Sequence, residues 1–140
     1  MPVTPSTAAS PPRPRTLSPY LVVLCSWLVP GSGHLLLGRW GRGAIIFATV
    51  LLSFVLGLLM RGPLFQPGGA DLLSRLIQFG GFIGDLASGL LYFLAVWLGY
   101  SAPDAAGHAP DYGSKFLVAA GLLNILAMVD VYEIATKQKD

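Results

Sequence analysis

The chain has 140 residues, of which 54% are hydrophobic and only 11% are charged. A soluble domain carries roughly 25% charged residues, which help to cover its surface. The composition therefore excludes an ordinary soluble globular protein and favours one that lies in a bilayer. The net charge of +2 is small, and scattered basic residues argue against nucleic-acid binding. The single cysteine, Cys25, excludes an intramolecular disulfide.

Both ends of the chain are polar. The first 19 residues contain six of the 11 prolines and show no apolar periodicity, which predicts a disordered tail over 1–19. Residues 137–140 form a second short polar tail. We expect the residues between them, 20–136, to form one helical membrane domain.

Four hydrophobic segments follow one another in this domain. A segment of 18 residues makes about 27 Å of helix, close to the hydrocarbon core of about 30 Å. The first segment is interrupted from Pro30 to Gly33, where a proline and two glycines oppose regular helix. The expected fold is an all-α polytopic bundle with the first segment broken there. The segments cover residues 20–38, 43–60, 76–100 and 116–135. Residues 101–114 between the last two predict a flexible loop.

The basic residues leave two topologies open. If all four segments cross, one side holds six basic residues and the other holds three, which favours cytoplasmic termini. The six are Arg13, Arg15, Arg61, Arg75, Lys137 and Lys139; the three are Arg39, Arg42 and Lys115. If the first segment instead dips in and returns, Arg39 and Arg42 also lie on the cytoplasmic side.

Aromatic residues near the segment ends predict belts at the two membrane interfaces. These residues are Tyr20, Trp40, Trp97, Tyr100, Tyr112 and Tyr132. Trp27 and Tyr92 do not fit this pattern, and we expect them to pack inside the bundle.

Asp85 and Asn124 are polar residues inside apolar segments. An aspartate at the centre of a membrane helix costs about 2.5–3.5 kcal/mol on insertion scales, so Asp85 should face the bundle or water. Gly80, Gly84 and Ser88 recur beside it at the spacing that lets another helix approach closely. Asn124 is a candidate partner for Asp85, and together they would form either an interhelical clasp or a functional polar site.

His34, Arg39, Arg42, Asp130 and Glu133 are further candidates. His34 follows the break and is read either as a bundle or interfacial residue or as part of an intramembrane polar site. Arg39 and Arg42 share one helical face and are candidate contacts for lipid headgroups, although snorkelling to the interface also explains them. Asp130 and Glu133 are interfacial acids that are either solvated or meet one of these arginines.

The motifs of catalysis and metal binding are missing. The sequence has no GxSxG, P-loop, complete GxGxxG, CxxC or HExxH spacing. We therefore predict no catalytic residues, no metal, no cofactor and no enzymatic activity. Only a cluster of His34 with Asp85 or Asp130 would revive the hypothesis of an intramembrane enzyme.

Two stretches carry a resemblance to known families. They are Trp27–Arg39 with Arg42-Gly43, which includes the PGSGH run, and Tyr112–Asn124 with Asp130. Together they resemble an uncharacterised bacterial family of small membrane proteins, a domain of unknown function of acidobacterial type. The resemblance implies a helical protein of the bacterial inner membrane and supplies no activity. The first half is also distantly similar to the two-transmembrane-helix domain family, but has Leu35-Leu36-Leu37 in place of that family's aromatic run.

These observations favour a structural role. We expect a scaffold or accessory subunit of the bacterial inner membrane, which contacts the bilayer and either copies of itself or another membrane protein. The alternative is a small transporter or channel component that uses Asp85 and Asn124.

Overall fold

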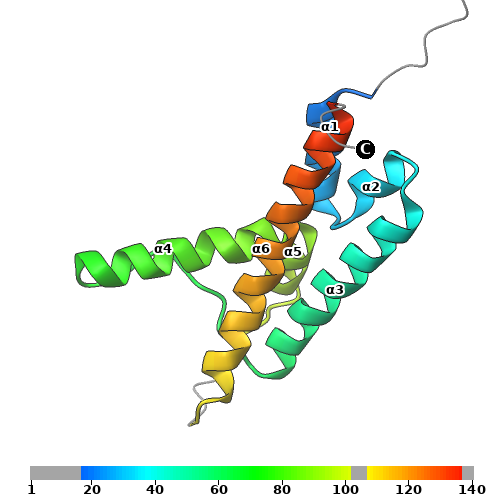
Figure 1. Cartoon of the computed structure of the whole chain (residues 1–140). Helices are drawn as coiled ribbons and strands as arrows, with labels where there is room; N and C mark the ends of the chain where they lie inside the picture. The colour runs from blue at the N-terminus through cyan, green and yellow to red at the C-terminus, as the bar shows by residue number, and fades with distance from the viewer. Residues whose placement is uncertain (1–16, 102–106, 137–140) are drawn as a thin grey trace, which may run out of the picture.

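The computed structural model describes residues 17–101 and 107–136, and in these ranges the chain folds into helices without a strand (Figure 1). The predicted all-α bundle is thus confirmed. Most of the predicted N-terminal tail, residues 1–16, and the C-terminal residues 137–140 lie outside the described residues. The helices are α1 (Pro19–Leu28), α2 (Ser32–Leu36), α3 (Trp40–Leu59), α4 (Leu72–Ala87), α5 (Leu90–Trp97) and α6 (Ala109–Ala135).

The long helices α3 and α6 form the antiparallel frame of the molecule. They have 20 and 27 residues, about 30 and 40 Å of helix, and both are long and apolar enough to cross a membrane. Arg42 near the start of α3 meets Asp130 near the end of α6. At the opposite end, Gly57 lies against Leu117. Buried residues of both helices and of α5 form the core between them: Val50, Phe54, Ala95, Leu117 and Ala120.

The first hydrophobic segment dips into the bundle and returns, which favours the second of the two topologies. Its helices α1 and α2 have only 10 and five residues and are too short to cross. The ring of Tyr20 lies 6.3 Å from that of Tyr132, and His34 contacts Asp130. Both ends of the segment therefore lie at the C-terminal end of α6, whereas Trp27 reaches Asn124, near the middle of that helix.

A break in this segment is confirmed, but it spans residues 29–31, and Ser32 and Gly33, which were expected in the break, form the start of α2. Gly31 has a φ of +79°, and a Cβ there would lie 2.4 Å from the backbone oxygen of Gly43. Only glycine combines this conformation with such a close approach to α3. The hydroxyl of Ser32 donates to the carbonyl of Cys25 at 2.6 Å, satisfying an acceptor in the last turn of α1.

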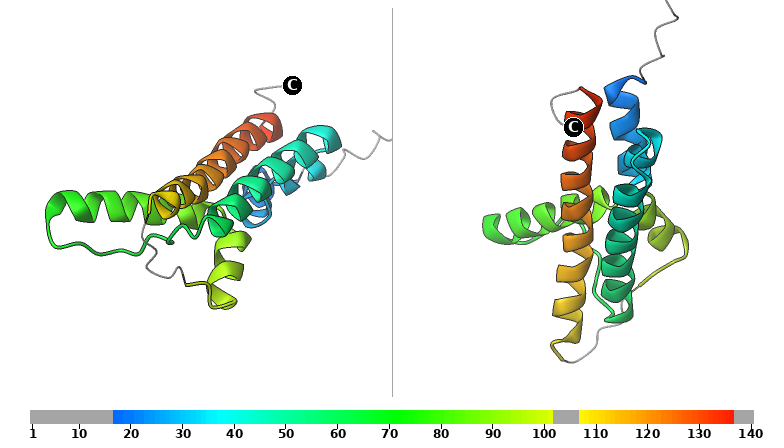
Figure 2. Two further views of the ribbon diagram at one scale, coloured as in Figure 1. Left: turned by 90° about the horizontal axis from the view of Figure 1, so that it is seen from below. Right: turned by 45° about the vertical axis from the view of Figure 1, so that its right-hand side comes forward.

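The third hydrophobic segment is also interrupted, which the sequence analysis missed. Helices α4 and α5 meet at Ser88 and Gly89 with a bend of 102°. Beyond the bend, α5 runs back toward the end of α3, where the hydroxyl of Tyr100 donates to the carbonyl of Gly62 at 2.9 Å. The N-terminal part of α4 projects sideways from the bundle, across α3 and α6 rather than along them (Figures 1 and 2).

The last helix starts earlier than predicted. Residues 109–114 were assigned to a loop, but they form the first turns of α6. Pro110 is tolerated there because the first-turn amides have no helical partner, and Asp111 interacts favourably with the helix dipole. These extra turns lengthen α6 to 27 residues, about 40 Å.

The aromatic residues define a frame for the bilayer. Tyr112 and Tyr132 lie 20 residues apart on α6, about 30 Å, which matches the hydrocarbon core. Tyr20 lies at the level of Tyr132. Trp27 and Tyr92, which were expected inside the bundle, are partly buried, and each makes an edge-to-face contact with Phe93. The middle of the frame falls near residue 122, where the two interrupted segments meet.

Candidate functional site

Asn124 joins the two interrupted segments near the middle of α6. Its side-chain amide donates to the carbonyl of Trp27 at 3.1 Å and to that of Ala87 at 2.8 Å. These carbonyls belong to the last turns of α1 and α4, where the helices stop and leave acceptors without an intrahelical partner. One NH₂ group thus satisfies one acceptor of each broken helix, in a place where lipid offers no hydrogen bonds.

Close backbone approach makes this junction possible. Gly89 has a φ of +66°, and a Cβ there would lie 1.9 Å from the carbonyl oxygen of Trp27. A Cβ at Gly121 would lie 1.6 Å from the carbonyl oxygen of Gly84. The indole of Trp27 also donates to the carbonyl of Leu86 at 3.2 Å. The three helices α1, α4 and α6 therefore touch through their backbones at this level.

Asp85 lies on the other side of the same crossing. Its side chain is fully buried, and one carboxylate oxygen accepts the backbone amide of Phe65 at 2.7 Å. The Ser88 hydroxyl donates to the backbone carbonyl of Asp85 at 2.6 Å. Asp85 thus ties the chain after α3 to the end of α4.

The predicted pairing of Asp85 with Asn124 is wrong, because each side chain satisfies a backbone group instead. The predicted stripe of small residues is confirmed in part. Gly84 packs against Val118 and Gly121 of α6, and Ser88 is buried, whereas Gly80 faces open space.

Among the described residues, three buried side-chain oxygens have no hydrogen-bond partner. They are Oδ1 of Asp85, Oδ1 of Asn124 and the hydroxyl oxygen of Ser26. Buried polar atoms usually have a partner in the protein or in water, so the crossing holds acceptor capacity that the fold does not use.

A second polar cluster lies where α2, α3 and α6 meet. The Nε2 atom of His34 is 2.9 Å from Oδ2 of Asp130, and a guanidinium nitrogen of Arg42 is 3.3 Å from the same oxygen. A carboxylate only accepts, so Nε2 of His34 carries the proton in this bond. The His34 side chain is fully buried, and its Nδ1 atom has no partner. This cluster fixes the returning helix α2 to both long helices.

The other candidates surround this cluster. The expected contact between an interfacial acid and an arginine is confirmed for Asp130 and Arg42. Arg39 is the residue before α3, and its backbone amide bonds to the carbonyl of His34 at 2.8 Å. Glu133 lies one turn beyond Asp130 on α6.

The pairing of His34 with Asp130 is one of the two clusters that would revive the hypothesis of an intramembrane enzyme. Arg42 contacts the same carboxylate oxygen, and the His34 side chain is fully buried. Among residues 17–101 and 107–136, no three His, Cys, Asp or Glu side chains are grouped to hold a metal ion.

The fold and the site together define a class: a small helical membrane protein in which two apolar helices of membrane length enclose two interrupted helical segments. The chain belongs to a family of unknown function, DUF6677, whose model matches residues 21–140. This membership bears out the resemblance to a domain of unknown function. No curated protein and no solved structure matches the chain closely enough to indicate a relative.

Proposed function

We propose that this protein is an accessory or scaffold subunit of a membrane assembly in the bacterial cytoplasmic membrane. The observation that carries the proposal is the projecting part of α4. Its apolar side chains reach away from the bundle and are covered by no other part of the described chain. Five of them are more than half exposed: Leu72, Leu73, Leu76, Ile77 and Phe79.

The polar start of α4 is what requires a protein partner. Figures 1 and 2 show that α4 crosses α6 near the middle of that helix and that the start of α4 projects to one side at about the same level. Asp71 and Arg75 are found there and are exposed. A charge in contact with the centre of a bilayer costs about 2.5–3.5 kcal/mol on insertion scales. Because irregular backbone before α4 also needs hydrogen-bond partners at this depth, protein rather than lipid should cover it.

The basic residues give the proposed orientation. Arg39 and Arg42 lie at the end of the bundle where α1 begins and α6 finishes. In the sequence, Arg13 and Arg15 precede α1, and Lys137 and Lys139 follow α6. Arg61 and Lys115 lie at the opposite end. Because basic residues favour the cytoplasmic side, both termini are cytoplasmic in this proposal. Arg39 and Arg42 would then face the headgroups of the inner leaflet.

Site-specific photo-crosslinking tests the assembly. A photoreactive residue in place of Leu76 should capture one protein at fixed stoichiometry, either a second copy or another subunit. The same residue in place of Leu126, an exposed position on α6, is the matched control and should capture lipid only. A chain that runs as a dispersed monomer in mild detergent, and crosslinks alike from both positions, would refute the proposal.

A second candidate is a transporter or channel component, and the junction at Asn124 favours it. Transporters often build ion sites from interrupted helices whose ends meet near the bilayer midplane. Here two such segments end at Asn124, and Asp85, Asn124 and Ser26 each carry a buried oxygen without a partner. Proton, Na⁺ and K⁺ flux into vesicles holding the purified chain tests this function. Asp85→Asn should abolish the flux, and an unchanged flux would remove Asp85 from the mechanism.

The predictions that the chain is not an enzyme and needs neither a cofactor nor a metal remain part of this proposal. Their support is the absence of catalytic and ligand motifs in the sequence.

A further inference from the structure

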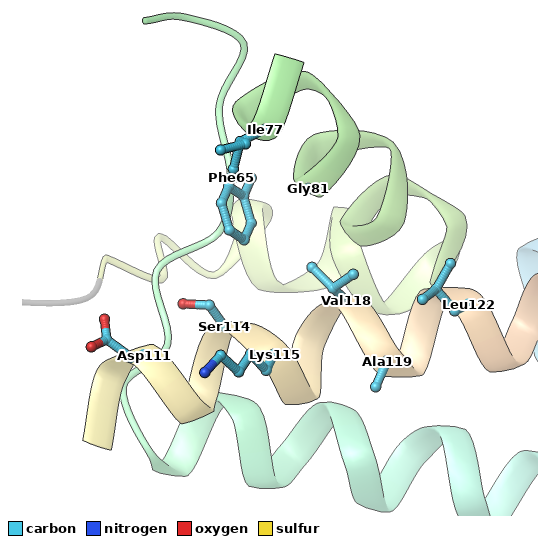
Figure 3. A pocket seen from close by; sticks show the side chains of 9 residues that line it. All are labelled: Phe65, Ile77, Gly81, Asp111, Ser114, Lys115, Val118, Ala119 and Leu122. Atoms are coloured by element: carbon cyan, nitrogen blue, oxygen red, sulfur yellow. The ribbon is translucent and has the colours of Figure 1, made fainter. Parts of the chain in front are cut away.

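A pocket of about 560 Å³ lies in the angle between α4 and α6 (Figure 3). This volume falls in the range of sites that bind small molecules, about 300–1,000 Å³. Its walls are apolar: Phe65 and Ile77 line one side, and Val118 and Leu122 of α6 line the other.

One end of the pocket is charged. Asp111 and Lys115 lie one turn apart at the start of α6, and both line the pocket. The Lys115 ammonium lies 5.0 Å from the centre of the Tyr112 ring, an aromatic residue at the membrane interface. The charged end therefore sits at headgroup depth, and it offers one negative and one positive group side by side.

The length of the pocket matches one leaflet. From Asp111 to Leu122 the helix rises by about 16 Å, half of the hydrocarbon core of about 30 Å. Beyond the pocket, α4 crosses α6 so closely that Gly84 and Gly121 touch through their backbones. The pocket is thus open to lipid along its side, charged at the interface and closed near the midplane.

We propose that this pocket binds one phospholipid with a zwitterionic phosphoethanolamine headgroup. Lys115 pairs with the phosphate, Asp111 pairs with the ammonium group, and an acyl chain lies along Val118 and Leu122. A purely anionic headgroup would satisfy Lys115 but place its charge beside Asp111, so the pair of charges selects the zwitterion. This site lies at the opposite end of the bundle from Arg39 and Arg42, and it stands whether or not α4 meets a protein partner.

Lipid retention by the full-length chain tests the proposal. The chain is reconstituted in vesicles of equal phosphatidylethanolamine and phosphatidylglycerol with matched acyl chains, extracted in mild detergent, and analysed by native mass spectrometry. We expect one phosphatidylethanolamine per chain, preferred about tenfold over phosphatidylglycerol, the scale of one charge-assisted hydrogen bond. Asp111→Lys, which makes both mouth residues basic, should reverse the preference.

A second pair of variants tests the apolar part. Ala119→Trp fills the pocket and should abolish retention, whereas Leu126→Trp, at an exposed position of α6 outside the pocket, should leave it intact. Equal retention of both lipids by the unmodified chain, or an unchanged preference in Asp111→Lys, would overturn the headgroup assignment. Full retention in Ala119→Trp would overturn the site. Because Asp111→Lys is read as a change of preference, it gives an answer even if Ala119→Trp does not fold.

Discussion

At the scale of single residues, Asn124 shows how one side chain joins two interrupted helices. Its NH₂ group bonds the carbonyls of Trp27 and Ala87. Replacing Asn124 with Asp keeps the size of the side chain but removes both donors and leaves two buried acceptors unsatisfied. We expect a loss of about 1–3 kcal/mol in stability, because hydrogen bonds in membrane proteins average about 0.6 kcal/mol while orphaned acceptors add a further penalty. Unfolding in detergent by increasing dodecyl sulfate measures this loss.

Thr49→Ala is the matched control for this variant. The hydroxyl of Thr49 donates to the carbonyl of Ile45 in its own helix, and the residue is exposed. Its removal costs a hydrogen bond without separating any helices, and we expect little change in unfolding. If Asn124→Asp unfolds like Thr49→Ala, the two bonds of Asn124 do not hold the interrupted segments.

At the scale of elements, the crossing of α4 over α6 depends on the absence of side chains. Gly121→Ala would place a Cβ 1.6 Å from the carbonyl oxygen of Gly84, and backbone must move to relieve it. We expect a loss of about 1–3 kcal/mol, typical of overpacking. Gly80→Ala, on α4 but facing open space, should instead stabilise by about 0.5–1 kcal/mol through helix propensity. The same detergent unfolding assay compares them, and equal effects of the two variants would contradict this crossing.

The start of α4 makes a prediction about helix capping. The hydroxyl of Ser74 donates to Asp71 at 2.5 Å and its backbone amide donates at 3.2 Å, so the carboxylate of Asp71 caps the first turn of α4. Asp71→Ala removes this acceptor, and we expect a loss of about 0.5–2 kcal/mol in stability. The same detergent unfolding assay measures this loss.

Asp71→Asn is the control for the cap. Asparagine caps helices as well as aspartate, so this variant should unfold like the unmodified chain. An equal loss of stability in Asp71→Asn and Asp71→Ala would show that the hydrogen bonds from Ser74 do not stabilise the start of α4.

At the scale of the whole molecule, the sequence predicts the helical membrane class and its elements better than it predicts the route of the chain through the bundle. The all-α membrane class, the span that forms α3 and the break after Leu28 follow from composition, length and Pro-Gly chemistry. The route of the chain does not follow from these features, because a hydrophobic segment of 19 residues has the same composition whether it crosses the bilayer or turns back within it. Its return is decided by contacts distant in sequence, such as that between His34 and Asp130.

The candidate site shows the same division. Polar side chains are rare in apolar segments, so the sequence singles out Asp85, Asn124 and His34. It does not reveal the groups to which they bond. Asn124 and Asp85 bond to backbone groups, and a backbone group carries no mark in the sequence. The one missed signal was Ser88-Gly89, since glycine in an apolar run often accompanies an interruption. If the second break had been recognised, two helix ends with unpaired backbone carbonyls would have been expected inside the bundle. Asn124 would then have been the candidate side chain to donate hydrogen bonds to them.

The return of the first segment leads to a test of topology. In a Cys25→Ser background, single cysteines replace Ser18 before α1, Trp40 at the start of α3 and Ser101 after α5, all exposed positions. We expect a membrane-impermeant maleimide to label the first two from the same side of the membrane, because α1 and α2 enter and leave at one end of the bundle, and to label Ser101→Cys from the other side. Labelling of Ser18→Cys and Trp40→Cys from opposite sides would mean that residues 20–38 cross the bilayer, and would separate His34 from Asp130. Labelling from the same cytoplasmic side places Arg39 and Arg42 at the inner leaflet and the mouth of the lipid pocket, at Asp111 and Lys115, at the outer one.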